Sequence, residues 1–127
     1  SYNNVIDIFL QENKLRKQIM GIKTDSTPME RPKDADSCNV FKLYKLLASN
    51  LQSTALKAKY NAGNYGYGDA KQELFEFICE KYKVERKKFN HLMENKVILD
   101  SELAKGAEKA RVIAREVLDR VRKKIGY

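Results

Sequence analysis

The sequence has no tryptophan, one histidine, two cysteines and two prolines among its 127 residues. It has no apolar run close to the roughly 18 residues that a membrane-spanning helix needs, and the stretch from Val5 to Leu10 is too short for a signal-peptide core. With so few cysteines and no export signal, a disulfide framework is not expected. These absences predict a cytoplasmic protein that does not enter a membrane.

The scarcity of histidine and cysteine also leaves little material for catalysis. A zinc site needs three or four ligands at close spacing, and Cys38, Cys79 and His91 lie far apart in the sequence. The run Thr24-Asp25-Ser26 could contain a nucleophile, but no general base is apparent for it, and short polar residues before a proline are typical of a turn. The sequence therefore predicts no catalytic residue and no metal site.

What the chain does have is positive charge, with 25 Lys and Arg against 17 Asp and Glu and a formal net charge of +8. This excess favours an anionic partner, nucleic acid first and a membrane surface second. The charge is uneven, because no acidic residue occurs from Ser37 to Tyr67. The lysines of this acid-free stretch are our candidates for phosphate contacts: Lys42, Lys45, Lys57 and Lys59.

Apolar residues at helical spacing predict a series of helices. A first helix around Leu15 and Ile19 should stop at Gly21, and residues 22–37, which hold both prolines, should be irregular. The helix that starts near Asp69 should be long, with a bend near Val84. The expected N-cap residues of the later helices are Asp36 or Ser37, Asn50, Asp69, and Asp100 or Ser101.

The last expected helix follows a short break at residues 96–99 and ends at Gly126. Its apolar residues follow one another at steps of four or three, which is typical of a packing seam: Leu103, Ala107, Ala110, Ala114, Val117, Val121 and Ile125. No strand pattern is apparent. The sequence therefore predicts an all-α fold, a helical bundle of about four to five helices with a long C-terminal helix.

The glycines at 63, 66 and 68 could suggest a phosphate-binding loop, but the stretch matches neither the Walker pattern nor the dinucleotide-binding pattern. A tight turn between two helices is the simpler interpretation. Tyr65 and Tyr67 nevertheless flank Gly66, and Lys71 lies one helical turn further on. Exposed tyrosines can stack on unpaired bases for about 1–3 kcal/mol each, so these three residues are further RNA-binding candidates. The alternative is that both tyrosines close the core.

Four motifs in this order resemble the C-terminal region of bacterial tryptophanyl-tRNA synthetases, which are class I aminoacyl-tRNA synthetases. They cover essentially the whole chain. In chain order they are Ser1 followed by Tyr2-Asn3-Asn4, Leu15–Ile22 with Thr24-Asp25-Ser26, Gly66-Tyr67-Gly68 with Lys71, and Leu103 with Gly106-Ala107-Glu108-Lys109-Ala110-Arg111. Ser1 corresponds to the final serine of the family's ATP signature loop, Lys-Met-Ser-Lys-Ser, and the rest of that loop is absent.

The resemblance implies a two-part enzyme that attaches tryptophan to its tRNA with ATP and Mg. On this resemblance we expect the parent to be a cytoplasmic homodimer, in which a Rossmann-like catalytic domain activates tryptophan and the helical part holds the anticodon loop. We expect this chain to be an excised helical fragment that binds tRNA weakly. Residues 1–24 would be the junction after the signature loop, with a linking helix, and residues 25–127 the anticodon-binding domain. The alternative is a helical protein-interaction adaptor whose basic patch meets an acidic protein.

The missing signature lysines lead to a testable prediction. Ser1 alone cannot hold a triphosphate, so the isolated chain should bind no ATP as a cofactor, activate no tryptophan and charge no tRNA. Tryptophan-dependent exchange of pyrophosphate into ATP measures this activity directly. We expect background exchange, and exchange above background by the purified polypeptide would contradict the prediction.

Overall fold

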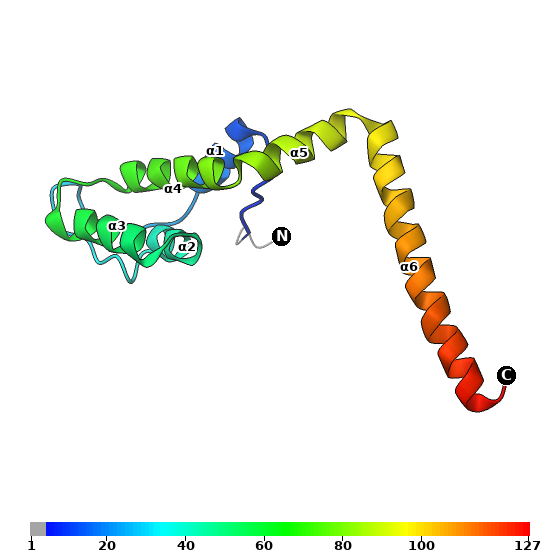
Figure 1. Ribbon diagram of the computed structural model, residues 1–127. Coiled ribbons are helices and arrows are strands. Elements are labelled where there is room, and N and C mark those ends of the chain that lie inside the picture. Colours follow the sequence, from blue (N-terminus) through cyan, green and yellow to red (C-terminus); the bar gives the residue numbers. More distant parts are fainter. Residues whose placement is uncertain (1–4) are drawn as a thin grey trace. The chain divides into compact units, whose positions relative to one another are not determined.

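The computed structural model describes residues 5–127, and within them the chain is helical, without a strand (Figure 1). This confirms the all-α class. The long C-terminal helix is also present. The helices are α1 (Glu12–Met20), α2 (Asn39–Leu47), α3 (Asn50–Ala62), α4 (Tyr67–Lys81), α5 (Lys83–Glu94) and α6 (Lys96–Ile125).

These six helices exceed the expected four to five because the long helix predicted from Asp69 is divided. The break falls at Tyr82, two residues before the bend expected near Val84. The backbone of Tyr82 leaves helical geometry, with φ −105° and ψ 21°. No helix within residues 5–127 is both long and apolar enough to cross a membrane.

The chain forms two compact units, residues 1–83 and residues 84–127. The first contains α1 to α4, and the second contains nearly all of α5 together with α6. The predicted division after residue 24 lies inside the first unit, where α1 packs against α4. Because that division concerns roles within a longer protein, it stays a prediction.

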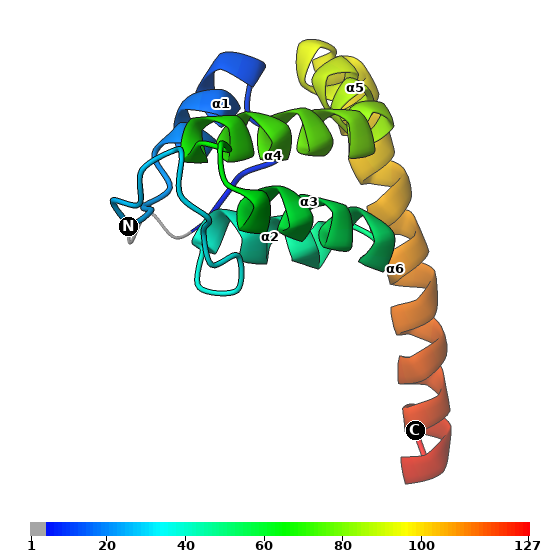
Figure 2. The same cartoon turned by 90° about the vertical axis from the view of Figure 1, so that its left-hand side faces the viewer.

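The first unit has two layers around one core. Figures 1 and 2 show α1 beside α4, with α2 and α3 on the other side of α4. The predicted apolar stripes of α1 and α2 face this core, since Leu15, Ile19, Val40 and Tyr44 are all buried. The buried apolar residues are Leu15, Ile19, Ala35, Cys38, Val40, Phe41, Tyr44, Leu56, Tyr60, Ala70, Leu74 and Ile78.

The expected cap of α2 was wrong, because the helix begins after Cys38 and not after Asp36 or Ser37. Those two residues belong to a preceding turn instead. The backbone N–H of Asp36 donates to Asp34 Oδ1, and Ser37 Oγ donates to the carbonyl oxygen of Asp34. The turn closes when the N–H of Cys38 donates to the carbonyl oxygen of Ala35 at 3.1 Å.

The cap of α3 falls one position before the expected residue, and that of α4 falls three positions before it. Ser49, and not Asn50, caps α3. The Ser49 hydroxyl oxygen accepts a hydrogen bond from the N–H of Gln52, and Gln52 Oε1 accepts one from the N–H of Ser49. Helix α4 starts at Tyr67, so Asp69 is its third residue, and Asp69 Oδ2 accepts a hydrogen bond of 3.0 Å from the N–H of Gly66. An acid at the third position reaches back to the N–H at the cap, which explains the shift.

In the second unit, α6 begins at Lys96, so the expected break at residues 96–99 was wrong and neither Asp100 nor Ser101 caps the helix. Asn95 caps it earlier, since its Oδ1 accepts a hydrogen bond of 3.3 Å from the N–H of Ile98. The predicted end at Gly126 is confirmed, because this glycine takes the left-handed conformation at φ 87°. No residue of α6 is buried.

Gly63, at the end of α3, generates a stability prediction. Its φ is 75°, and a Cβ atom placed there would lie 2.7 Å from the carbonyl oxygen of Glu30. Both effects oppose a side chain, so Gly63→Ala should lower the free energy of unfolding by about 1–3 kcal/mol in urea titrations. Gly68→Ala is the control, because its Cβ meets no atom within 4 Å. Equal stability of the two variants would contradict this account.

Candidate nucleic-acid interface

The irregular segment before α2 is fixed by one buried cation, Lys33. Only 4% of Lys33 is exposed, and its Nζ donates hydrogen bonds of 3.0–3.2 Å to the carbonyl oxygens of Pro28, Met29 and Arg31. Its backbone N–H donates to the carbonyl oxygen of Tyr60 at 2.8 Å. A buried ammonium needs such acceptors, and their number explains why it is tolerated. Sequence reasoning missed Lys33, since nothing distinguishes this lysine from exposed ones.

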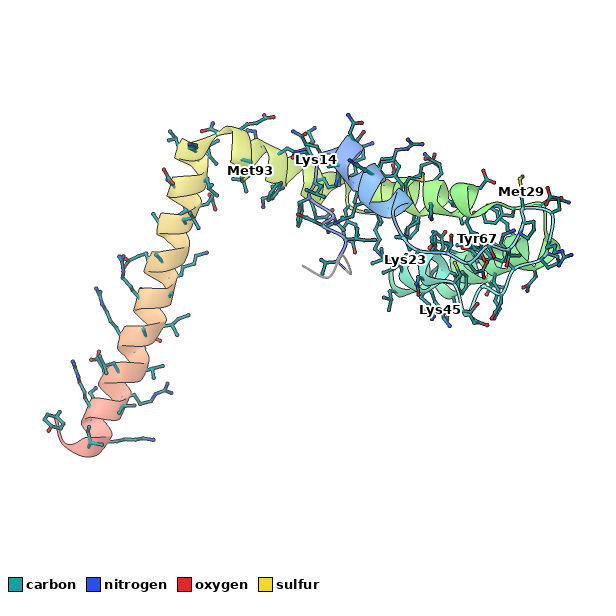
Figure 3. All side chains as sticks on the ribbon, turned by 180° about the vertical axis from the view of Figure 1, so that it is seen from behind. Lys14, Lys23, Met29, Lys45, Tyr67 and Met93 are labelled. Atoms are coloured by element: carbon teal, nitrogen blue, oxygen red, sulfur yellow. The ribbon has the colours of Figure 1, made fainter. Side chains whose placement is uncertain are left out.

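Tyr67 joins the same segment to α4. Its hydroxyl donates to Asp25 Oδ1 at 2.7 Å, and Lys33 Nζ lies 5.4 Å from the centre of its ring. Burial, reinforced by the hydrogen bond to Asp25, raises the pKa of Tyr67 to about 12. Hydrogen bonds from Thr27 and then from Tyr67 lower the pKa of the Asp25 carboxyl. Figure 3 shows Tyr67 between α4 and the layer that contains α2 and α3.

Tyr65 is half-buried and bonded on the other side of the same turn. Its hydroxyl donates to Glu73 Oε2 at 2.7 Å, and its ring centre lies 5.6 Å from that of Tyr60. Burial, followed by the hydrogen bond to Glu73, raises the pKa of Tyr65 well above its ordinary value. The core-closing alternative considered for both tyrosines therefore agrees with their positions, and their contact with RNA stays a prediction.

Lys71 joins α4 to α1. Its Nζ donates a hydrogen bond of 3.0 Å to the carbonyl oxygen of Met20, in the last turn of α1. A cation at a helix C-terminus satisfies a free carbonyl and complements the helix dipole. One residue further along α4, Gln72 Oε1 accepts a hydrogen bond of 3.2 Å from Arg16 Nε. Lys71 thus has a structural role, and its predicted RNA contact is untested.

The four lysines of the acid-free stretch fall into two pairs. Lys57 forms an ion pair with Asp36, and Lys59 forms one with Glu73 at 2.9 Å. Lys42 and Lys45 are exposed on α2, and among residues 5–127 neither has a carboxylate within ion-pair distance. Because Lys42 and Lys45 are three residues apart, their side chains lie on the same face of the helix. Figure 3 shows Lys45 pointing away from the first unit.

The described residues offer little for chemistry on a substrate. Between residues 5 and 127, no three His, Cys, Asp or Glu side chains gather closely enough to hold a metal ion. His91 is exposed on α5. Ser1, which the resemblance assigns to the ATP signature loop, lies outside the described residues. The arrangement that this part of the chain does offer is a rigid helical layer carrying exposed lysines, which suits binding to an anion.

Comparison with known proteins shows which class of protein this chain is similar to. No family model matches the chain. Curated relatives do match it, and they are aminoacyl-tRNA ligases. The tryptophan–tRNA ligase of Campylobacter jejuni strain RM1221 is 44% identical over 126 residues, which is 99% of this chain and 40% of the relative. That of Fusobacterium nucleatum is 41% identical over 99% of the chain and 38% of the relative.

A solved structure agrees. The crystal structure of tryptophanyl-tRNA synthetase from Campylobacter jejuni, complexed with ADP and tryptophan, has a TM-score of 0.85 at 43% identity and covers 99% of this chain and 40% of that one. The chain spans about two fifths of the length of these relatives. It matches the C-terminal part of tryptophan–tRNA ligases, which confirms the resemblance predicted from the sequence.

The environment of Tyr67 predicts a late tyrosine titration. The difference in tyrosinate absorbance between the chain and its Tyr67→Phe variant should rise at about pH 12, and not near the ordinary value of about 10. Because the folded-state pKa is raised, the neutral, hydrogen-bonded phenol stabilises the fold fully below pH ~10, and this stabilisation disappears as pH rises through about 12. Asp25→Asn should move the step toward lower pH. A step near pH 10 in the unmodified chain would contradict the buried, bonded phenol.

Proposed function

We propose that the chain is the anticodon-binding and hinge part of a tryptophan–tRNA ligase. Its partner is then the tRNA for tryptophan, and it works beside a catalytic domain that uses ATP and Mg to activate tryptophan. The similarity to the C-terminal part of such ligases over 99% of the chain supports this. A homodimeric parent and a cytoplasmic location belong to the same proposal.

The observation that carries the RNA-binding role is the pair of exposed lysines on α2. Lys42 and Lys45 lie on one face, and in the described part of the chain neither forms an ion pair. Neither cation is held in an ion pair, so both can reach RNA phosphates, although the Asp36 carboxylate acts on Lys45 from beyond ion-pair distance. Binding then releases counterions from the RNA, which makes the affinity fall steeply with salt.

Lys57 and Lys59 can add to this surface by exchanging partners. Their ion pairs are partly exposed, with 43% and 50% of the two lysine side chains accessible to solvent. Such pairs contribute about 0–1 kcal/mol, so a phosphate group can replace the carboxylate at little cost. A different role falls to the residues that bond within the fold, namely Tyr65, Tyr67 and Lys71. They hold in place the helices that present these lysines.

Nucleotide chemistry is assigned to the rest of the parent enzyme. We derive no catalytic step from the residues of this chain. Weak binding of tRNA without catalysis is the activity proposed for it.

Binding to tRNA against rising salt tests the proposal. The logarithm of the association constant should fall linearly with the logarithm of the salt concentration. Lys42→Glu combined with Lys45→Glu should weaken binding and reduce the slope by about 2, roughly one for each phosphate that the chain no longer neutralises. Fluorescence anisotropy with labelled tRNA provides the measurement.

The matched control reverses the same amount of charge elsewhere. Lys105 and Lys109 lie on α6 and are exposed, so changing both to Glu should leave the salt slope nearly unchanged. Equal effects of the two double variants would contradict a binding surface on α2. A chain that binds tRNA no better than heparin would instead favour the adaptor alternative, in which the basic patch meets an acidic protein.

A further inference from the structure

A turn before α2 holds the exposed carboxylate of Asp36 in place. The backbone N–H of Asp36 donates to Asp34 Oδ1, and the hydroxyl of Ser37 donates to the carbonyl oxygen of Asp34. Three residues before Asp36, the buried Lys33 joins the chain to α3, because its N–H donates to the carbonyl oxygen of Tyr60. The backbone therefore fixes Asp36 from both sides, while its side chain faces solvent.

This carboxylate neutralises one lysine of the acid-free stretch. Asp36 Oδ2 lies 2.5 Å from Nζ of Lys57 on α3, and the side chains of the lysine and the acid are 43% and 57% exposed. The hydrogen bond from Lys57, followed by the charges of Lys57 and of Lys45 on α2, lowers the pKa of the Asp36 carboxyl. One acid from outside the stretch thus acts on lysines of both helices.

The second neutralised lysine, Lys59, differs because its partner is bonded twice. Glu73 accepts a hydrogen bond of 2.7 Å from the hydroxyl of Tyr65 in addition to its ion pair with Lys59, and only 30% of its side chain is exposed. The Asp36 carboxylate has no such second bond, since Lys57 is the only side chain of the described residues that bonds it. Of the two acids, Asp36 is therefore the one that an incoming anion can displace more readily.

A carboxylate that pairs with a lysine resembles an RNA phosphate in its charge and its hydrogen bonding, because both present anionic oxygen acceptors to an ammonium group. Exposed pairs of this kind are weak, so a phosphate that reaches Lys57 can replace the carboxylate. The displaced carboxylate stays close, since the turn fixes its backbone, and it then repels the phosphate.

We propose that Asp36 is an internal competitor for RNA, whose carboxylate occupies at Lys57 the position of one backbone phosphate. RNA binding to the surface formed by Lys42, Lys45 and Lys57 then includes an exchange of this carboxylate for a phosphate. The acid limits the affinity of the surface, because every anion that uses Lys57 has to displace it. This inference rests on the proposed function, since it requires RNA on α2 and α3.

A double-mutant cycle on tRNA binding tests the competition. Asp36→Asn keeps the shape of the side chain and removes its charge. It should raise the affinity for tRNA about three- to fivefold at fixed salt, since separating an exposed ion pair lowers an affinity by up to about fivefold. In a Lys57→Met background, Asp36→Asn should raise the affinity by less than about twofold, because the lysine for which the acid competes is gone. Fluorescence anisotropy with labelled tRNA provides the measurement.

Glu30→Gln is the matched control. Glu30 is an exposed acid of the same irregular segment, and within residues 5–127 it forms no ion pair. Its neutralisation removes the same charge as Asp36→Asn does, so it should raise the affinity by less than about twofold, and equally with and without Lys57→Met. Both acids are exposed, so neither substitution disturbs the core.

The outcomes separate this inference from the proposed function. If Asp36→Asn produces no gain, the same gain as Glu30→Gln, or a gain that persists in full with Lys57→Met, the competition is overturned and RNA binding is left intact. If neither the unmodified chain nor Asp36→Asn binds tRNA, the proposed function itself is refuted. Binding by Asp36→Asn alone would support the competition in its strongest form.

Discussion

The burial of Tyr60 is the interaction on which the first unit depends. Its side chain is fully buried, and its ring contacts those of Phe41, Tyr65 and Tyr67 at centre distances of 5.7, 5.6 and 6.5 Å. Its hydroxyl lies 3.5 Å from the sulfur of Cys38, and burial raises its pKa well above the ordinary value. One residue of α3 thereby joins α2, the turn before α4 and, through its carbonyl oxygen, the irregular segment at Lys33.

This arrangement determines which groups are left for a partner. The hydroxyls of Tyr65 and Tyr67 and the amine of Lys71 bond to Glu73, Asp25 and Met20 within the fold. The motif that resembles the synthetase helix entry thus holds three segments of the chain together. Lys42 and Lys45 are exposed on α2, and neither forms an ion pair within the described residues. The fold thus separates cations that bond within it from exposed cations that form no ion pair in the described residues.

The sequence predicted helices well because their signal is local. The stripes of Leu15 with Ile19 and of Val40 with Tyr44 follow from spacing alone, and Gly126 ends α6 as glycine often does. Cap positions were off by one to five residues, since several neighbouring side chains could serve each cap. Asn95 and Ser49 were missed for this reason, whereas Gly66 was missed because Asp69 reaches back to its N–H from the third position of α4.

The contacts of the candidate site were less predictable because they join distant parts of the chain. Asp25 and Tyr67 are 42 residues apart, and no pattern connects them. The acid-free stretch is free of acids only in sequence, since Asp36 and Glu73 from outside it fold back onto Lys57 and Lys59. Lys33 resembles any exposed lysine until the fold surrounds it with carbonyl groups. Of the four predicted lysines, Lys42 and Lys45 are the two that form no ion pair within residues 5–127.

The central claim is that α2 meets RNA while the tyrosine cluster holds the fold. NMR spectra of the chain during titration with its tRNA test this most directly, because backbone amides and aromatic ring signals report on both places at once. We expect shifted amides around Lys42 and Lys45 and unchanged ring signals for Tyr65 and Tyr67. Large upfield shifts of those ring signals, with the α2 amides unchanged, would contradict the claim, since they would show bases stacked on the tyrosines.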